Sequence, residues 1–202
     1  WKNKEFTDKH NLPEGSGGYI YGFNLIHFGA DIHNPEDKGF NQLDYVINTL
    51  RENPKSRQAC FTFWRPDTNN QAILPACHAF YSFIVSPDEN NEMKILNCHV
   101  FQRSADYPIG VGAGNITTAA LFTYLIAQQL DMKPGMLYHS ASQCHIYQNA
   151  VNSTKEYLER IETPDSPILK IRKKSSIYDY TIDDLMVFDY TPAEQIKFNI
   201  AV

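Results

Sequence analysis

The chain has 202 residues, a net charge of −5, and 43% hydrophobic and 13% aromatic residues. These values are typical of an ordered globular protein, and we expect residues 1–202 to form one domain. An acidic chain lacks the basic surface of a DNA-binding protein, and its longest apolar stretch, 116–130, is too short to cross a bilayer. We therefore expect neither DNA nor a membrane as a partner.

Cysteine usage points to a reducing compartment, and we expect a cytoplasmic protein. The four cysteines show no short-loop disulfide spacing, and a chain of this size needs no disulfides for stability. Three of them are followed directly by a histidine. Neighbouring side chains in a strand point to opposite faces, and no CxxC or HExxH motif is present, so we expect no metal site.

The first half of the chain predicts a loop, two strands and a helix. Residues 1–18 are polar and end in a glycine-rich run typical of a flexible loop, and 19–28 predict an aromatic-rich strand. After a polar loop over 31–38, apolar residues recur at helical spacing until Pro54; they are Phe40, Leu43, Ile47 and Leu50. Residues 58–65 are again apolar and β-prone.

The second half predicts a hairpin that is followed by a buried helix. A strand from Cys77 to about Val85 and a strand over 93–102 flank a turn, so they should pair. Asn115 occupies the expected N-cap of a helix over 116–129, which is apolar on nearly every side and should be buried at the centre of the domain. A strand from Met136 into Tyr147, a helix over 149–161 and a strand-like tail over 167–202 follow.

Cys77 is the candidate nucleophile. An unpaired cysteine in apolar surroundings is usually inert, but Arg103 lies about 25 residues later, and a nearby cation stabilises a thiolate. The sequence GVGAG over 110–114 does not have the GxGxxG spacing of a dinucleotide site. We expect it to form a tight turn where the backbone approaches a planar ligand.

Several motifs in one order resemble the thymidylate synthase family, whose members methylate deoxyuridylate with a folate co-substrate. The match covers residues 19–202 and is densest at CHAF over 77–80, QRS over 102–104, HIY over 145–147, SIYDY over 176–180 and the last seven residues. The resemblance implies an α+β layered fold with a large mixed β-sheet and a buried central helix.

The resemblance also implies a chemistry. Cys77 would add to C6 of the uracil of dUMP, so that C5 attacks the methylene of 5,10-methylenetetrahydrofolate and dTMP and dihydrofolate are released. Tyr21 would lie near the C5 proton, and His78 would belong to the water network near O4. The alternative is that Tyr21 is a plain strand aromatic and His78 a hydrogen-bonded structural histidine.

Substrate binding follows from the same matches. Asn115 matches the amide that pairs with N3–H and O4 of uracil, whereas relatives that act on cytosine nucleotides carry aspartate there. The other implied nucleotide ligands are Gln102, Arg103 and Ser104, the last two for the phosphate, with His145 and Tyr147 for the ribose 3′-hydroxyl on one strand face.

Folate and dimer contacts complete the implied site. Asp106 matches the carboxylate that binds the pterin ring, at the edge of the nucleotide site. The implied wall around the folate consists of Trp1, Ile109, Gly110, Tyr147, Ala201 and Val202. Arg57 matches an arginine that reaches the phosphate of the partner subunit, so the resemblance implies a homodimer with shared active sites; the arginine usual at the next position is Gln58.

Departures from the family pattern keep alternatives open. A phosphate-loop arginine and a catalytic glutamate should lie before Trp1, and the chain begins without methionine, so we expect an N-terminal portion to be missing. Residues 112–114 replace a bulkier segment, SASQ over 140–143 replaces a threonine–glycine–glycine–aspartate run, and Ala150 replaces a histidine. A pyrimidine nucleotide hydroxymethylase, in which water quenches the intermediate, and a non-catalytic nucleotide- or RNA-binding relative remain alternatives.

Overall fold

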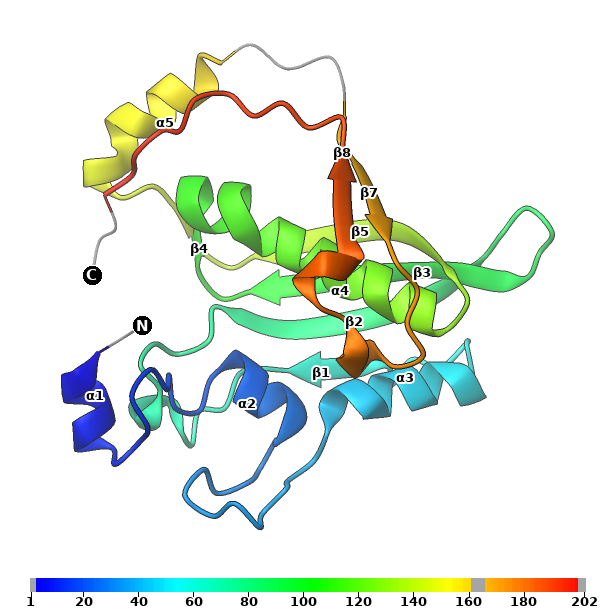
Figure 1. Ribbon diagram of the computed structural model, residues 1–202, viewed down its shortest axis with the longest axis horizontal. Helices are drawn as coiled ribbons and strands as arrows, with labels where there is room; N and C mark the ends of the chain where they lie inside the picture. Colours follow the sequence, from blue (N-terminus) through cyan, green and yellow to red (C-terminus); the bar gives the residue numbers. More distant parts are fainter. Residues whose placement is uncertain (1–2, 161–165, 200–202) are drawn as a thin grey trace.

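A four-stranded mixed sheet forms the centre of the protein in the computed structural model, which describes residues 3–160 and 166–199 (Figure 1). Its strand order is β1-β2-β3-β5, with antiparallel pairs β1/β2 and β2/β3 and a parallel pair β3/β5. The strands are β1 (Cys60–Thr62), β2 (His78–Pro87), β3 (Met93–Gln102) and β5 (Lys133–Ala141). The α+β class and the large mixed sheet are confirmed.

The β2–β3 hairpin follows the prediction closely. Its turn lies over residues 88–91, where Asn91 adopts a left-handed backbone (φ 62°), a conformation that asparagine tolerates. The register pairs Ser82 with His99 and His78 with Gln102. Cys77 lies just before β2, and Arg103 just after β3, so the open end of the hairpin brings these two residues together.

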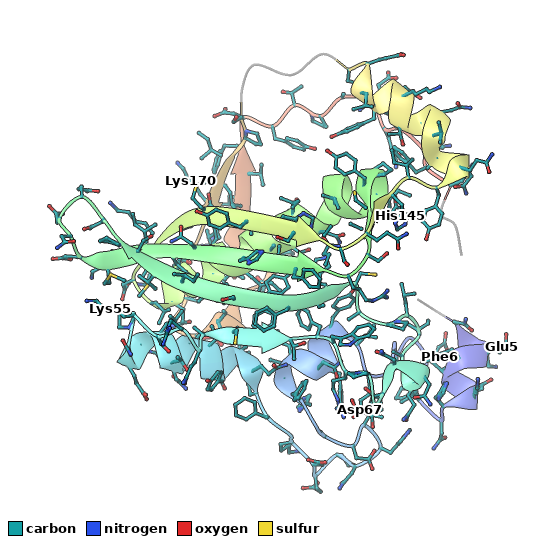
Figure 2. All side chains as sticks on the ribbon, turned by 180° about the vertical axis from the view of Figure 1, so that it is seen from behind. Glu5, Phe6, Lys55, Asp67, His145 and Lys170 are labelled. Carbon is teal, nitrogen blue, oxygen red and sulfur yellow. The ribbon has the colours of Figure 1, made fainter. Side chains whose placement is uncertain are left out.

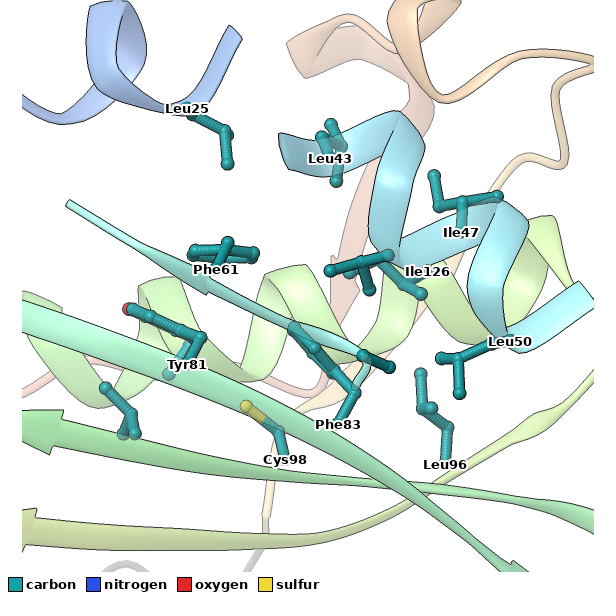
Figure 3. Close-up of a cluster of buried hydrophobic side chains, with 14 of the residues drawn as sticks. Leu25, Leu43, Ile47, Leu50, Phe61, Tyr81, Phe83, Leu96, Cys98 and Ile126 are labelled. Atoms are coloured by element: carbon teal, nitrogen blue, oxygen red, sulfur yellow. The ribbon is translucent and has the colours of Figure 1, made fainter. Parts of the chain in front are cut away.

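Helices cover one face of this sheet and enclose the core (Figure 3). Alternate residues of β2 point inward, and Tyr81 and Phe83 are almost fully buried. Helix α3 (Gln42–Glu52) packs beside β1 and begins at Asn41, whose side chain accepts hydrogen bonds from the backbone N–H groups of the next turn. The core cluster around these elements includes Val46, Leu50, Phe61, Leu96 and Ile126.

Helix α4 (Ile116–Gln129) lies across β3 and β5 (Figure 1). It continues from a π-helical segment, η2 (Tyr107–Asn115), so the expected tight turn over 110–114 is wrong. Together, η2 and α4 form a continuous helix of 23 residues, which by length and composition alone could cross a membrane. The stretch 116–130 by itself is too short to do so. Burial is confined to one stripe, because Ala119, Thr123, Ile126 and Ala127 are buried while Tyr124 is 39% exposed.

Two N-terminal segments differ from their prediction. Residues predicted as a strand over 19–28 form helix α2 (Tyr21–Ile26), because Leu25 reaches the core and the buried Asn24 donates to the carbonyls of Tyr19 and Phe63. The polar segment predicted as loop contains helix α1 (Lys4–Lys9). Its N-cap Asn3 accepts a hydrogen bond from the backbone N–H of Phe6. The polar composition of the segment favoured a loop, although Asn3 is a typical helix-capping residue.

The C-terminal third is more broken than predicted. The expected strand from Met136 to Tyr147 is interrupted after β5, and a short β6 (Cys144–His145) pairs in parallel with β4 (Ala105–Asp106). Helix α5 (Val151–Leu158) follows, and Ser153 Oγ donates to the carbonyl of Lys197 in the tail, 2.8 Å away. The strand-like tail is confirmed in part by the hairpin of β7 (Ile168–Ile171) and β8 (Leu185–Phe188).

In the part of the chain that the structure describes, four short 3₁₀ turns connect these elements. They are η1 (Asn69–Gln71), η3 (Gln148–Ala150), η4 (Ile177–Asp179) and η5 (Ile182–Asp184). The last of them places Asp184 in the buried interior of the tail.

Candidate active site

A guanidinium group lies beside the Cys77 sulfur. Arg103 Nη2 is 3.8 Å from Cys77 Sγ, and the backbone N–H of Arg103 donates to the carbonyl of Cys77 at 3.0 Å. Arg103 Nε and Nη2 also donate to the carbonyls of Ala76 and Pro75 at 2.9 and 2.6 Å, and the group lies 5.1 Å from the centre of the Trp64 ring. The cation is thus held in place where it can stabilise a thiolate.

The thiols of Cys98 and Cys60 are poor candidates for a nucleophile. Burial raises the pKa of Cys98 to about 11 and also raises the pKa of Cys60, so both stay protonated near neutral pH. Cys144 is exposed on β6. Only Cys77, of the four cysteines, is in contact with an arginine among the described residues.

Tyr21 lies next to Cys77, although it belongs to a helix rather than to a strand. Its Oη accepts a hydrogen bond of 3.0 Å from the backbone N–H of Cys77. Its ring packs edge-on against the His78 ring, with ring centres 5.9 Å apart. Burial raises the pKa of Tyr21, so this phenol keeps its proton at neutral pH.

His78 is buried and hydrogen-bonded to a residue that the sequence analysis did not identify. Its Nδ1 lies 2.6 Å from Tyr81 Oη. Burial lowers the pKa of His78; the nearby Asn115 amide opposes this effect, and the nearby His139 reinforces it. His78 is therefore a neutral imidazole at pH 7. The alternation of side chains along β2 predicts that Tyr81 points inward, but it does not predict the contact with His78 Nδ1.

Asn115 is held by side chains and does not cap the helix. It stands at the N-cap position of α4, but its backbone is helical and its side chain makes no cap hydrogen bond. Gln102 Nε2 donates to Asn115 Oδ1 at 3.0 Å, and His139 Nε2 lies 2.5 Å from Gln102 Oε1. His139 was not predicted as a site residue, because no local pattern links β5 to Gln102.

Gly110 allows this arrangement. A Cβ atom built at Gly110 would lie 2.8 Å from Asn115 Oδ1, closer than carbon and oxygen normally approach. The glycine is thus needed for a close approach, as expected, but the neighbour is Asn115. Ile109, in the same π-helical segment, is half-buried.

A cavity of about 410 Å³ lies between these groups and the core. Tyr21, His78, Tyr81 and Asn115 form its polar side, and Phe63, Leu25 and Phe122 belong to its apolar side. Cavities of this size and mixed lining are typical of sites for small organic ligands. Because Tyr21 also contacts Cys77, the cavity adjoins the candidate nucleophile.

Asp106 and His145 form a second polar cluster, at the β4/β6 pair. The two residues are register partners, and Figure 2 shows His145 near the α4 end of the sheet. Among the described residues, Asp106 Oδ1 and His145 Nδ1 are buried without a hydrogen-bond partner. Buried polar atoms are rarely left unpaired, so both atoms fit ligand groups that donate or accept hydrogen bonds, such as those of a pterin and a ribose.

Tyr147 contacts His145, but the two residues are not arranged as predicted. It lies beyond β6, at the start of η3, so the two residues do not share one strand face. Their rings nevertheless meet edge to face, with centres 4.8 Å apart. Ser104 lies between β3 and β4, and its carbonyl is 3.4 Å from Gln102 Nε2.

Some predicted residues are not part of this cluster. Arg57 is exposed in the loop between α3 and β1, and Figure 2 shows Lys55 of the same loop at the far end of the sheet from His145. Trp1, Ala201 and Val202 lie outside the described residues. Within the described ranges, no group of three or more histidine, cysteine, aspartate or glutamate side chains is arranged to hold a metal ion.

Comparison with known proteins points to the same family as the sequence motifs. The family model for thymidylate synthase matches residues 1–202. The chain is 34% identical to the bifunctional dihydrofolate reductase-thymidylate synthase of Leishmania major over 99% of its own length and 39% of that protein. It is 34% identical to thymidylate synthase of Saccharomyces cerevisiae and 36% identical to that of Homo sapiens, over 99% of the chain and 69% and 64% of these proteins.

The chain thus spans about two fifths of the length of the bifunctional relatives and about two thirds of the length of the single-function ones. The match over every described element, together with the thiol–arginine pair that adjoins a cavity lined by the amide of Asn115, shows that this chain belongs to the thymidylate synthase family.

Proposed function

We propose that the protein methylates C5 of dUMP to give dTMP, through a bond between Cys77 Sγ and C6 of the uracil. The observation that carries this proposal is the pairing of Cys77 Sγ with Arg103 Nη2 at 3.8 Å beside a cavity that Asn115 lines. A thiolate next to a fixed guanidinium is a competent nucleophile, and an amide can recognise a pyrimidine edge. The names of the relatives favour methyl transfer over hydroxymethyl transfer.

The residues of this chain would act in sequence. Arg103 stabilises the Cys77 thiolate and, with Ser104, binds the phosphate of dUMP. Asn115 holds the uracil, and neutral His78 donates a hydrogen bond toward the O4 side of the site. Tyr21, a neutral phenol beside Cys77, would lie near the C5 proton that is removed.

5,10-Methylenetetrahydrofolate would supply the one-carbon unit and the reducing hydride, and dihydrofolate would leave. Asp106 would bind its pterin ring, because Oδ1 is buried and unpaired among the described residues and can accept from ring N–H groups. His145 and Tyr147 would hold the ribose, and Ile109 and Gly110 would border the folate. Trp1, Ala201 and Val202 remain predicted folate contacts.

We further propose a homodimer in the cytoplasm, with Arg57 contributed to the active site of the partner. The sheet face opposite the helices exposes large apolar side chains on three adjacent strands: Phe80, Ile84, Phe101, Met136 and Tyr138. A contiguous exposed apolar surface of this kind marks an interface. Four unpaired thiols are compatible with a reducing compartment.

The test is a product analysis. The protein is incubated with dUMP and 5,10-methylenetetrahydrofolate, and both products are identified by mass spectrometry. We expect dTMP and dihydrofolate from the wild type and from the control Cys144→Ser, and neither product from Cys77→Ser. 5-Hydroxymethyl-dUMP with tetrahydrofolate would assign the hydroxymethylase reaction instead, and turnover by Cys77→Ser would overturn the assignment of the nucleophile.

A further inference from the structure

Two adjoining cavities lie between the C-terminal ends of α3 and α4, away from the candidate active site. The larger one, called the α3–α4 cavity below, has a volume of about 340 Å³ and the smaller one about 180 Å³. Arg51 and Gln129 line both of them. Pro54, which lines the larger cavity, directly precedes Lys55, and Figure 2 shows Lys55 at the far end of the sheet from His145.

Helix α4 separates this cavity from the candidate active site. Asn115 immediately precedes the first residue of α4, and Gln129 is its last. A helix of 14 residues is about 20 Å long, because each residue adds about 1.5 Å. The α3–α4 cavity is therefore a separate site and not an extension of the cavity that Asn115 lines.

The floor of the α3–α4 cavity is apolar and contains two thioethers. Leu50 is fully buried, and Met93, Leu130 and Met132 pack against the core while staying partly exposed. A methionine sulfur makes favourable contacts with an aromatic ring, and the flexible side chain adapts to the shape of a ligand. This floor therefore favours a flat aromatic group.

Two cations line the cavity without a carboxylate partner. Within residues 3–160 and 166–199, neither Arg51 nor Lys94 forms a salt bridge, and Arg51 Nη1 donates to the neutral Asn48 Oδ1 at 2.7 Å. Asp131, the one carboxylate among the lining residues, is bonded to Lys173. The C-terminal ends of two helices contribute roughly one negative charge together, which is less than the two cations supply. The cavity therefore favours an anion.

Gln129 supplies a hydrogen-bond acceptor. Its Nε2 donates to the carbonyl of Ser175 at 3.1 Å, and this bond fixes the orientation of the amide. In the described part of the chain, Gln129 Oε1 is buried without a hydrogen-bond partner. Buried acceptors are rarely left unpaired, so this oxygen fits an N–H or O–H donor of a ligand.

We propose that the α3–α4 cavity binds a small aromatic acid that carries a ring N–H or O–H group. The ring lies on Met93 and Met132, and the carboxylate is held by Arg51 and Lys94. The ring donor bonds to Gln129 Oε1. Binding at this site does not depend on the proposed reaction, because no residue of the candidate active site takes part.

The methionines of the chain report on this site separately from the rest of the surface. Of the four methionines, Met93 and Met132 line the cavity, Met136 lies on the exposed face of the sheet, and Met186 lies in β8. The full chain is labelled with methyl-¹³C-methionine, and each NMR signal is assigned by its loss in a leucine variant. Three probes are titrated: indole-3-acetate, tryptamine, which has an ammonium group in place of the carboxylate, and 1-methylindole-3-acetate, which lacks the ring N–H.

We expect indole-3-acetate to shift the signals of Met93 and Met132, with a dissociation constant of about 1 mM or lower, and to leave Met136 and Met186 unshifted. Tryptamine should bind at least about tenfold more weakly, and 1-methylindole-3-acetate about fivefold more weakly. A shift of Met136 alone would place the probe on the sheet face. A shift of Met132 without Met93 would place it in the neighbouring cavity between α4 and β7. Either result, or equal affinity for indole-3-acetate and tryptamine, would overturn the proposal.

Charge-removing variants test the two cations individually. Arg51→Gln and Lys94→Gln should each weaken the binding of indole-3-acetate about tenfold, as for the loss of one charge-assisted contact. Lys155→Gln, at an exposed position on α5, is the matched control and should bind like the wild type. Unchanged affinity in both cavity variants, with the fold verified by circular dichroism, would contradict the proposal. If either variant fails to fold, the comparison of the three probes on the wild type decides.

Discussion

At the scale of single residues, the candidate site depends on short distances around Asn115. Gln102 holds its side chain by a hydrogen bond, and Gly110 leaves room for this arrangement. None of these contacts is local in sequence, apart from that between Gly110 and Asn115. An amide that is held in one orientation before the ligand arrives loses little entropy on binding, which favours affinity.

Gly110→Ala should displace Asn115 without unfolding the protein. The new Cβ would lie 2.8 Å from Asn115 Oδ1, so the amide must move. We expect affinity for dUMP to fall about tenfold or more, as for the loss of one hydrogen bond, in a calorimetric titration. Gly114→Ala is the matched control, because a Cβ there meets no atom within 4 Å. Equal affinities for the two variants would contradict the role of Gly110.

At the scale of elements, helix α3 begins at a capping residue, Asn41, that also contacts the C-terminal region. Asn41 Oδ1 accepts from the backbone N–H groups of Leu43 and Asp44, and its Nδ2 donates to Tyr178 Oη at 2.8 Å. Tyr178 in turn donates to Asp44 Oδ1 at 2.7 Å. One side chain thus connects the start of α3 with the tail.

Asn41→Ala should lower the free energy of unfolding by about 1–2 kcal/mol, the usual cost of losing an N-cap. Urea denaturation followed by circular dichroism measures this change. Asn41→Ser keeps a capping oxygen but loses the contact with Tyr178, so it should lie between the wild type and Asn41→Ala. If Asn41→Ser were as unstable as Asn41→Ala, the tail contact and not the cap would dominate.

The tail hairpin depends on a buried carboxylate, and this gives the stability a pH dependence. The backbone N–H of Thr181 and the ammonium group of Lys174 hold the pKa of Asp184 below its ordinary value of 3.8. The folded state therefore binds the Asp184 proton less readily than the unfolded state does. The stabilisation is fully present above pH 4 and is lost as the pH falls through the folded pKa.

Asp184→Asn should remove this acid-sensitive component. Urea midpoints measured between pH 6 and pH 3 should fall less steeply for the variant than for the wild type. Asp183→Asn, at the exposed neighbouring position, should follow the wild-type curve. Parallel curves for wild type and Asp184→Asn would show that other carboxylates govern the acid response.

At the scale of the whole molecule, the two faces of the sheet differ. One face carries the helices and the core, and the other exposes apolar side chains that no element of residues 3–160 and 166–199 covers. Ile84, 57% exposed, lies on this second face and pairs with Asn97 of β3. The proposed homodimer would cover the exposed face and would bring Arg57 to the active site of the partner.

Ile84→Glu should convert the dimer to monomers, because it places a charge in an apolar interface. Analytical ultracentrifugation measures the mass. Leu158→Glu, at a position 70% exposed on α5, is the control and should stay dimeric. A monomeric wild type would refute the proposed assembly.

Shared sites would also allow complementation. In a mixed dimer of Cys77→Ser and Arg57→Ala subunits, one of the two sites has both residues intact. Random mixing gives such dimers half of the time, so about a quarter of wild-type activity should return. If activity stays absent while mixed dimers form, Arg57 does not act across the interface.

Local sequence patterns were sufficient to predict several elements and the contact between Cys77 and Arg103. The β2–β3 hairpin follows from two β-prone runs around one short turn, and its register brings Cys77 and Arg103 together at the open end. Helix α3 follows from the spacing of its apolar residues. The pairing of thiol and guanidinium was therefore predictable, since only a turn had to form for the two residues to meet.

Other features required contacts between distant segments. Residues 19–28 have strand-like composition, yet they form α2 because Asn24 bonds to Phe63, just after β1, and Leu25 packs in the core. The sequence by itself determined the α+β class, the hairpin and the family motifs, because these depend on local propensity and motif order. Only the tertiary structure decided the partners of Tyr81, Gln102 and His139, because a hydrogen bond depends on positions and angles that burial and packing impose.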